Sequence, residues 1–357
     1  MSRPIQVTLN QQALYHNIQC VKLHAPQQRI MAVVKDNAYG HGAIWVAQCL
    51  SPLINAFAVS SLDEALVLRH AGITQPILLL GGFFHADELP LLVKYQLETV
   101  IHSFRQIHIL QKSSLKQRIK AWLKIDTGMH RLGFLPEQML IAWRALQKSE
   151  LIAQPIHLMS HLACADEENN PLTTQQIALF NEFKQLFNTE TSLANSAAIL
   201  TLPQTHADWV RPGIMLYGAF PLEMSKTSPL QPVMTLQSRL ISVKHCYRGE
   251  TVGYGATWRC PEDMRIGVIA AGYGDGYPRH APIGTPILVN NQRVPLIGRV
   301  SMDLITVDLR TQPQAQVDDP VILWGKGLPI EEIAFHAKTI AYELFCNINQ
   351  RIERKYF

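Results

Sequence analysis

The chain has 357 residues, of which 47% are hydrophobic and 17% are charged, and its formal net charge at pH 7 is +4. This composition supplies enough apolar side chains for large cores and excludes an intrinsically disordered chain. Apart from the tail at residues 351–355, lysine and arginine do not cluster, so we expect no nucleic-acid surface and no membrane surface. The length fits one α/β barrel of ~250 residues with a smaller second domain.

The six cysteines are scattered along the chain without a C-x-x-C pair, and no secretory signal opens the sequence. Both features predict reduced thiols and a cytoplasmic location. Apolar runs such as residues 76–80 fall well short of the ~20 residues that span a bilayer. We therefore expect no transmembrane segment, and the sequence predicts no metal site.

The first two thirds of the chain repeat one pattern. Asn10 is the expected N-cap of a helix whose apolar face includes Leu14 and Ile18. Further helices are expected to open at Ser61 and at Thr173. Between such helices lie eight short apolar runs that predict strands: 30–34, 56–60, 77–80, 98–101, 121–125, 156–159, 191–193 and 208–210.

Eight strands that alternate with helices over about 220 residues predict an α/β fold, a (β/α)8 TIM-like barrel. In such barrels the active site gathers at the carboxyl ends of the strands. An open doubly wound sheet is the alternative. Against it, no G-x-G-x-x-G motif follows the first strand, and candidate chemical residues follow several strands instead of clustering at one switch point.

From Met234 onward the pattern changes to short alternating β runs separated by turn residues. The expected strands are 236–243, 265–270, 285–289, 294–297, 304–309 and 320–323, with a helical stretch at 329–339. We therefore expect the barrel in residues 1–230 and a smaller, mostly β domain in residues 231–357.

Lys35 stands directly after the first apolar strand, in the stretch V-V-K-D-N-A-Y-G-H-G. A lysine at the carboxyl end of a barrel strand is partly desolvated, which favours the neutral amine that acts as nucleophile and base. This position predicts a Schiff-base lysine. The alternative from the residue alone is a lysine that extends into solvent.

Polar residues also follow the fifth to eighth predicted strands. Arg131 suits a carboxylate or another oxygen ligand, although it could equally be a surface arginine. His161 could orient a neighbour or be an ordinary core histidine. Ser196 is typical of a helix N-cap, and such a cap at a barrel end is also a phosphate site, together with the backbone amides of Gly213 and Ile214.

The stretch around Lys35 resembles the pyridoxal-phosphate attachment motif of alanine racemases, with Asp36 where the family commonly has alanine. The segments that carry Arg131, His161 and Ser196, and R-P-G-I-M-L-Y-G at 211–218, resemble the same family. The resemblance implies that Lys35 holds pyridoxal 5'-phosphate and that Tyr39 contacts its phosphate.

The resemblance places Arg211 against the pyridine nitrogen of the cofactor. Since an arginine keeps its proton at neutral pH, that nitrogen should stay unprotonated, which favours brief proton removal followed by return. The segment T-V-G-Y-G-A-T-W at 251–258 resembles the family segment that carries a second catalytic base, Tyr254. Inversion of a carbon centre needs a base on each face, so Lys35 would serve one face and Tyr254 the other. His161, bonded to Arg211, is the expected electrostatic partner of this phenol.

Two further segments, 271–279 and 298–303, match the site-entrance and substrate-carboxylate regions of the family. Met302 would donate its backbone amide to the carboxylate, although a methionine alone would be taken as core. The resemblance implies a homodimer with shared active sites, which Tyr254 and Met302 enter from the other subunit.

The chain departs from the family pattern at two positions. Ser301 stands where a cysteine is frequent, and Gln350 lies near a position where many members have a phosphate-contacting tyrosine. Lys124 occupies a position that is carbamylated in some relatives.

The prediction is therefore an alanine racemase, a pyridoxal-phosphate-dependent isomerase. It would interconvert L- and D-alanine by a two-base mechanism on a pyridoxal-phosphate aldimine and supply D-alanine for peptidoglycan. One alternative is a barrel-type decarboxylase of basic amino acids, which would release carbon dioxide. The other is a non-catalytic pyridoxal-phosphate-binding protein, although such carriers resemble only the barrel.

Overall fold

The computed structural model describes residues 3–222 and 228–357, which form two compact units. One unit contains Asn17–Leu216 and is built on a closed barrel of eight parallel strands. The other contains the N-terminal residues to His16, Tyr217–Phe220 and the C-terminal part of the chain. In the described part of the chain, no helix has the length and apolar character needed to cross a bilayer.

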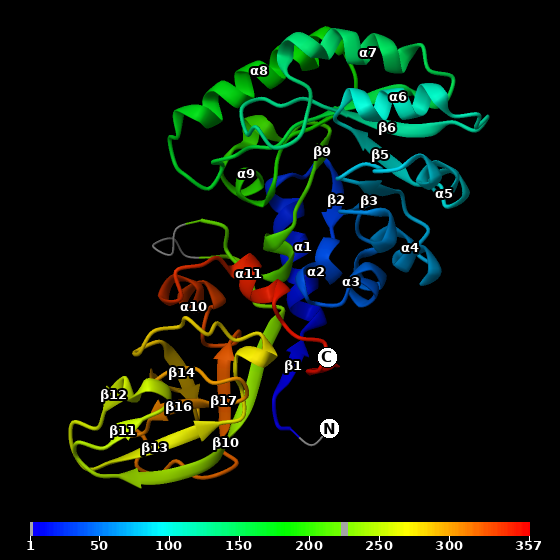
Figure 1. Ribbon diagram of the computed structural model, residues 1–357. Helices are drawn as coiled ribbons and strands as arrows, with labels where there is room; N and C mark the ends of the chain where they lie inside the picture. The colour runs from blue at the N-terminus through cyan, green and yellow to red at the C-terminus, as the bar shows by residue number, and fades with distance from the viewer. Residues whose placement is uncertain (1–2, 223–227) are drawn as a thin grey trace. The chain divides into compact units, whose positions relative to one another are not determined.

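The barrel confirms the predicted fold class. Its strands close in chain order (Figure 1). Most of their residues are buried, because both faces are covered. The strands are β2 (Arg29–Val33), β3 (Ala56–Val59), β4 (Ile77–Leu79), β5 (Glu98–Ile101), β6 (Ile119–Lys124), β7 (Ile152–Met159), β8 (Thr191–Ser192) and β9 (Trp209–Val210). Each overlaps one of the eight apolar runs, so the apolar pattern located every strand.

The helices between residues 11 and 216 connect these strands. Asn10 caps the first of them as predicted, since its side-chain Oδ1 accepts a hydrogen bond from Ala13 N at 3.0 Å. The helix expected to open at Thr173 instead begins at Pro171, where Asn170 is the cap and accepts from Leu172 N at 2.9 Å. The helices are α1 (Gln11–His24), α2 (Lys35–Tyr39), α3 (Ala43–Leu50), α4 (Leu62–His70), α5 (Leu89–Lys94), α6 (Phe104–Lys112), α7 (Met139–Gln147), α8 (Pro171–Phe187) and α9 (Ser196–Thr201).

The second unit, here called the β unit, is built on an eight-stranded sheet in the order β13-β16-β15-β14-β17-β10-β1-β18. A separate two-stranded hairpin is formed by β11 and β12. The elements are β1 (Gln6–Leu9), β10 (Met234–Cys246), β11 (Thr251–Val252), β12 (Trp258–Arg259), β13 (Met264–Ile269), β14 (Pro286–Val289), β15 (Gln292–Ile297), β16 (Ile305–Asp308), β17 (Pro320–Trp324), α10 (Ile330–His336), α11 (Ala341–Cys346) and β18 (Glu353–Tyr356).

Strand β1 joins this sheet although it precedes the barrel in the chain. It pairs antiparallel with β10 and parallel with β18, so both ends of the chain meet in one sheet (Figure 1). The sequence prediction had placed residues 1–230 together in the barrel. A four-residue strand carries too little pattern to reveal its partners, which lie more than two hundred residues away in sequence.

Short 3-10 helices connect several elements. They are η1 (Ala86–Glu88), η2 (Pro136–Gln138), η3 (Pro203–Thr205), η4 (Ile214–Tyr217), η5 (Tyr254–Ala256) and η6 (Tyr273–Asp275). Three of them, η4 to η6, contain or adjoin residues that the sequence singled out.

Candidate active site

Lys35 lies at the carboxyl end of β2 and opens a turn of left-handed backbone. Asp36, Asn37, Ala38 and Tyr39 have φ angles of 57°, 53°, 54° and 51°. Non-glycine residues in this region are strained by about 1 kcal/mol or more each, and four in succession persist only where the surroundings impose them. Such strain is characteristic of functional sites, and here it follows directly after the lysine.

Glu64 of α4 holds this turn in place. One carboxylate oxygen accepts from Asp36 N at 2.5 Å and the other accepts from Ser60 N at 2.6 Å. The carboxylate therefore ties the residue after Lys35 to the end of the neighbouring strand β3. Ser61 occupies the N-cap position of α4 as predicted, but its hydroxyl makes no capping bond.

We expect Glu64→Ala to lower catalytic turnover more than it lowers stability. The substitution leaves two backbone amides without their charged acceptor, which costs about 1–3 kcal/mol, and it loosens the strained turn beside Lys35. Glu64→Gln keeps one acceptor oxygen, so its turnover and its stability should lie between those of the unsubstituted chain and those of Glu64→Ala. Turnover and urea unfolding of both variants give the measurement.

Glu88 provides the control, because one of its carboxylate oxygens also accepts from two backbone amides, Phe84 N at 3.0 Å and His85 N at 2.9 Å, in the turn after β4. Glu88→Ala should lose comparable stability while keeping turnover. A Glu64 variant whose activity loss only matches that of the Glu88 variant would contradict a positioning role.

A second group of residues meets around Gly213. Ser196 Oγ accepts from Gly213 N at 2.9 Å and from Met215 N at 3.4 Å. A Cβ built on Gly213 would lie only 2.7 Å from the phenolic oxygen of Tyr39. Tyr39, Ser196, Gly213 and the adjoining Ile214 therefore converge, and a side chain at position 213 would force the phenol of Tyr39 to shift. Asn195, rather than Ser196, caps α9, since its Oδ1 accepts from Ala198 N at 3.1 Å.

Arg211 is 4% exposed and its guanidinium is fixed by neighbouring acceptors. Nη1 donates to Ser192 Oγ at 2.6 Å, and Nη2 donates to the carbonyl oxygens of Ser160 at 2.6 Å and Leu193 at 3.2 Å. Nη2 also lies 3.3 Å from Nδ1 of His161. Burial lowers the pKa of Arg211 to about 10, which still leaves the guanidinium charged at neutral pH.

His161 stays neutral in this environment. Its pKa is far below the ordinary value, first because of burial and then because of the cations Arg211, Lys124, Arg131 and Lys35. Since the guanidinium donates to Nδ1, the remaining proton of the imidazole belongs on Nε2. Four cations thus act on one neutral ring, and their combined field suits an anionic ligand such as a phosphate or a carboxylate.

Lys124, Arg131 and His161 line one small cavity at the ends of β6 and β7. Lys124 is buried at the end of β6, whereas Arg131 is exposed. The loop between them is fixed by Asp126, whose Oδ1 accepts from Gly128 N at 2.9 Å and His130 N at 3.0 Å. The barrel unit therefore brings Lys124, Arg131, His161 and Arg211 close together, and Lys35 is near enough to lower the pKa of His161.

The buried ammonium of Lys124 predicts a pH-dependent stability. Burial, followed by the nearby Arg211 and Arg131, lowers its pKa from 10.5 to about 8. Between these two values the unfolded chain binds the additional proton, so stability should rise with pH from about 8 to about 10.5 and then level off. The gain is on the order of 1–3 kcal/mol.

Urea unfolding on both sides of pH ~8, in bicarbonate-free buffer that leaves the amine unmodified, checks this prediction. Lys124→Met should lose the rise and should be the more stable protein below pH ~8. Parallel pH profiles for the two proteins would contradict it.

Tyr254 and Met302 belong to the β unit. Tyr254 lies in η5 between Gly253 and Gly255, whose φ angles are 77° and 72°, and it is 71% exposed. The β11–β12 hairpin supports this turn on both sides. Met302 is 54% exposed, and its carbonyl accepts from Gly274 N at 2.8 Å. Both residues therefore reach the surface from short, hydrogen-bonded segments.

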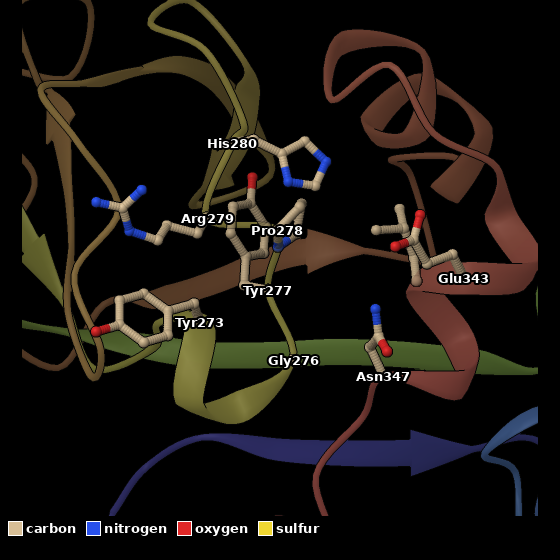
Figure 2. A pocket seen from close by; sticks show the side chains of 9 residues that line it. Tyr273, Gly276, Tyr277, Pro278, Arg279, His280, Glu343 and Asn347 are labelled. Atoms are coloured by element: carbon tan, nitrogen blue, oxygen red, sulfur yellow. The ribbon is translucent and has the colours of Figure 1, made fainter.

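The segment expected at the site entrance lines a pocket of about 290 Å³ within the β unit. Figure 2 shows Tyr273 and Arg279 on one side of this pocket, with Glu343 of α11 and Asn347, which follows this helix, on the other. The turn that carries Tyr273 also contains Asp275, a fully buried carboxylate that accepts from Arg3 at 2.7 Å and from Arg351 at 2.9 Å. These ion pairs fix the turn that carries Tyr273.

Sequence reasoning missed three residues that fix the site residues in position. Glu64 stands four residues after Ser60, and Asp275 lies inside a segment that was identified only as an entrance. Ser192 ends β8 and binds Arg211. A polar side chain at a strand end was a usable signal for Ser192, whereas the partners of Glu64 and Asp275 appear only once the chain is folded.

Comparisons with known proteins agree over nearly the whole chain. Residues 9–221 match the family model described as alanine racemase, N-terminal domain, and residues 233–356 match alanine racemase, C-terminal domain. The chain is 50% identical over 353 residues to a biosynthetic alanine racemase of Escherichia coli, covering 98% of each chain. It is 48% identical over 353 residues to an alanine racemase of Coxiella burnetii, covering 97% of each.

Solved structures give the same result. The crystal structure of the biosynthetic alanine racemase from Pseudomonas aeruginosa has a TM-score of 0.95 at 44% identity and covers 99% of each chain. The alanine racemase of Acinetobacter baumannii has a TM-score of 0.92 at 36% identity, covering 99% of this chain and 100% of that one. By its barrel, its β unit and these similarities, the chain belongs to the alanine racemase family.

Proposed function

We propose that this chain interconverts L- and D-alanine with pyridoxal 5'-phosphate held by Lys35. The proposal rests on three features at one end of the barrel. They are the strained turn after Lys35, the close approach of Tyr39 and Ser196 to Gly213, and the four cations around the neutral His161. Relatives of similar length that bear the name alanine racemase support the choice of substrate.

The residues of the barrel unit fit the cofactor. Tyr39, Ser196, Gly213 and Ile214 would hold its phosphate, because the phenol of Tyr39 and the hydroxyl of Ser196 both approach the backbone at Gly213. Arg211 would face the ring nitrogen and donate a hydrogen bond to it. The bound cofactor supplies an electron sink that makes the α-hydrogen of an attached amino acid acidic.

Proton transfer is assigned to two side chains. Lys35 Nζ would remove or return a proton on one face of the α-carbon, and the phenolic oxygen of Tyr254 would do so on the other. Since Arg211 keeps its charge with a pKa of about 10, it supplies a hydrogen bond and no proton. Arg131 and the backbone amide of Met302 would hold the substrate carboxylate, and His161 would keep Arg211 in position.

The proposal extends to assembly and location. A homodimer with shared sites, in which Tyr254 and Met302 come from the second subunit, would explain why both residues are exposed in this chain. The proposed location is the reducing cytoplasm, where D-alanine would be made for peptidoglycan; the six cysteines, scattered along the sequence without a C-x-x-C pair, support it.

Incubation of the purified protein with L-alanine in deuterated water tests the proposed function. We expect D-alanine that carries deuterium at the α-carbon, because the base on the opposite face carries a deuterium taken from the solvent and delivers it to that carbon. Chiral analysis and a carbon dioxide assay with lysine, ornithine and diaminopimelate distinguish the alternatives. Carbon dioxide release would indicate a decarboxylase, and cofactor binding without exchange or inversion would indicate a carrier.

A further inference from the structure

Two cysteines of the β unit lie at the base of the hairpin that carries Tyr254. Cys246 is the last residue of β10, and Cys260 follows β12 directly. The backbone of Cys260 closes the hairpin, since its N–H donates to Glu250 O and its carbonyl accepts from Gly249 N, both at 2.8 Å. Tyr254 therefore lies within the segment that the two cysteines bracket.

The two thiols share one small apolar core. Cys260 is 1% exposed and packs in a cluster with Val252, Met264, Ile266 and Ile297, against which the half-buried Cys246 is packed. In the β10–β13 ladder, Cys246 is the direct partner of Met264, a member of this cluster. The pKa of the Cys260 thiol is raised first by burial and then by the neighbouring Cys246 side chain.

We propose that Cys246 and Cys260 form an oxidisable dithiol site, at which hydrogen peroxide produces a disulfide that constrains the Tyr254 hairpin. Cys246 is the accessible member and reacts first. Its sulfur attacks the peroxide, the O–O bond breaks, and a sulfenic acid and one water form. The Cys260 sulfur then attacks the sulfenic sulfur and releases a second water. The two thiols lose two electrons and two protons, and one peroxide is reduced to two waters.

The new bond changes the geometry of the hairpin base. Sulfur atoms in non-bonded contact are farther apart than the roughly 2 Å of a disulfide, so bond formation draws the end of β10 toward the end of β12. A catalytic group tolerates little displacement, and a shift of ~1 Å lowers the rate by about 100-fold in unfavourable cases. The effect on turnover rests on the proposed role of Tyr254, whereas the disulfide itself does not.

Peroxide treatment of the reduced holoenzyme tests the proposal. Peptide mapping without reductant should find Cys246 joined to Cys260, and thiol titration should fall by two of the six cysteines. Turnover should fall at least about tenfold and return on addition of dithiothreitol. Cys246→Ser should racemise as the unsubstituted chain does and keep its turnover in peroxide. Cys164→Ser, which removes a half-exposed thiol of the barrel unit, should still form the bond.

A disulfide with any other cysteine, a bond between subunits, or sulfinic acid at Cys246 without a cross-link would overturn the proposed site. A mapped Cys246–Cys260 bond with unchanged turnover would overturn its effect on the hairpin. Peptide mapping requires no activity, so a reduced protein that fails to racemise alanine would refute the proposed function and leave the dithiol result standing.

Discussion

Replacement of Lys35 by alanine is expected to abolish racemisation and the visible absorbance of a lysine-bound cofactor together. Lys35 is both the proposed attachment point and one of the two bases, so a single substitution removes both. A positioned base alone contributes about 10²–10⁴-fold, and we therefore expect turnover to fall by more than about 10⁴-fold. Absorbance spectra and chiral product analysis of the purified variant measure the two effects.

Lys112 supplies the control, because it is an exposed lysine in the last turn of α6 within the same unit. Lys112→Ala should keep both the absorbance and the turnover. A Lys35→Ala protein that retains a covalently bound cofactor would show that another lysine is the attachment point, with the buried Lys124 as the next candidate.

Replacement of Tyr254 by phenylalanine is expected to leave cofactor binding intact and to stop proton transfer on one face only. The equilibrium constant between L- and D-alanine is one because they are mirror images, so kcat/KM must fall equally in both directions, by about 10²–10⁴-fold. The distinguishing result is α-hydrogen exchange in deuterated water. L-Alanine should lose its exchange, whereas D-alanine should still exchange through Lys35.

Tyr247 is the matched control, since it is 61% exposed and belongs to the same unit. Tyr247→Phe should exchange and racemise normally. Mixed dimers of the Lys35→Ala and Tyr254→Phe chains should regain activity if each site draws residues from both subunits. Loss of exchange with both enantiomers in Tyr254→Phe would contradict the assignment of one base to each face.

The sequence predicted those features of the structure that depend on residues close together in the chain. Apolar runs located all eight barrel strands, because strands buried on both faces must be apolar along their length. The type of residue after each strand then identified Lys35, His161 and Arg211, because the strand order of a barrel brings those positions to one end. The N-cap role of Asn10 could be predicted because its side chain bonds to the backbone of Ala13, only three residues further along the chain.

Signals that depend on distant parts of the chain were not available from the sequence. The left-handed backbone from Asp36 to Tyr39 contradicts the local preference of these residues and is held by Glu64, which is 28 residues away from Asp36. The membership of β1 in the β unit depends on partners at the other end of the chain. The depressed pKa of His161 requires cations from several strand ends.

The barrel, the mostly β C-terminal part and the residue types available for chemistry can be predicted from the sequence, because alternation, apolar runs and motifs are properties of neighbouring residues. The carboxylate that supports Lys35, the oxygens that fix Arg211 and the sheet that the two chain ends share are known only from the folded chain. Hydrogen bonds, burial and electric fields act through space, so their partners are defined only when the chain has folded.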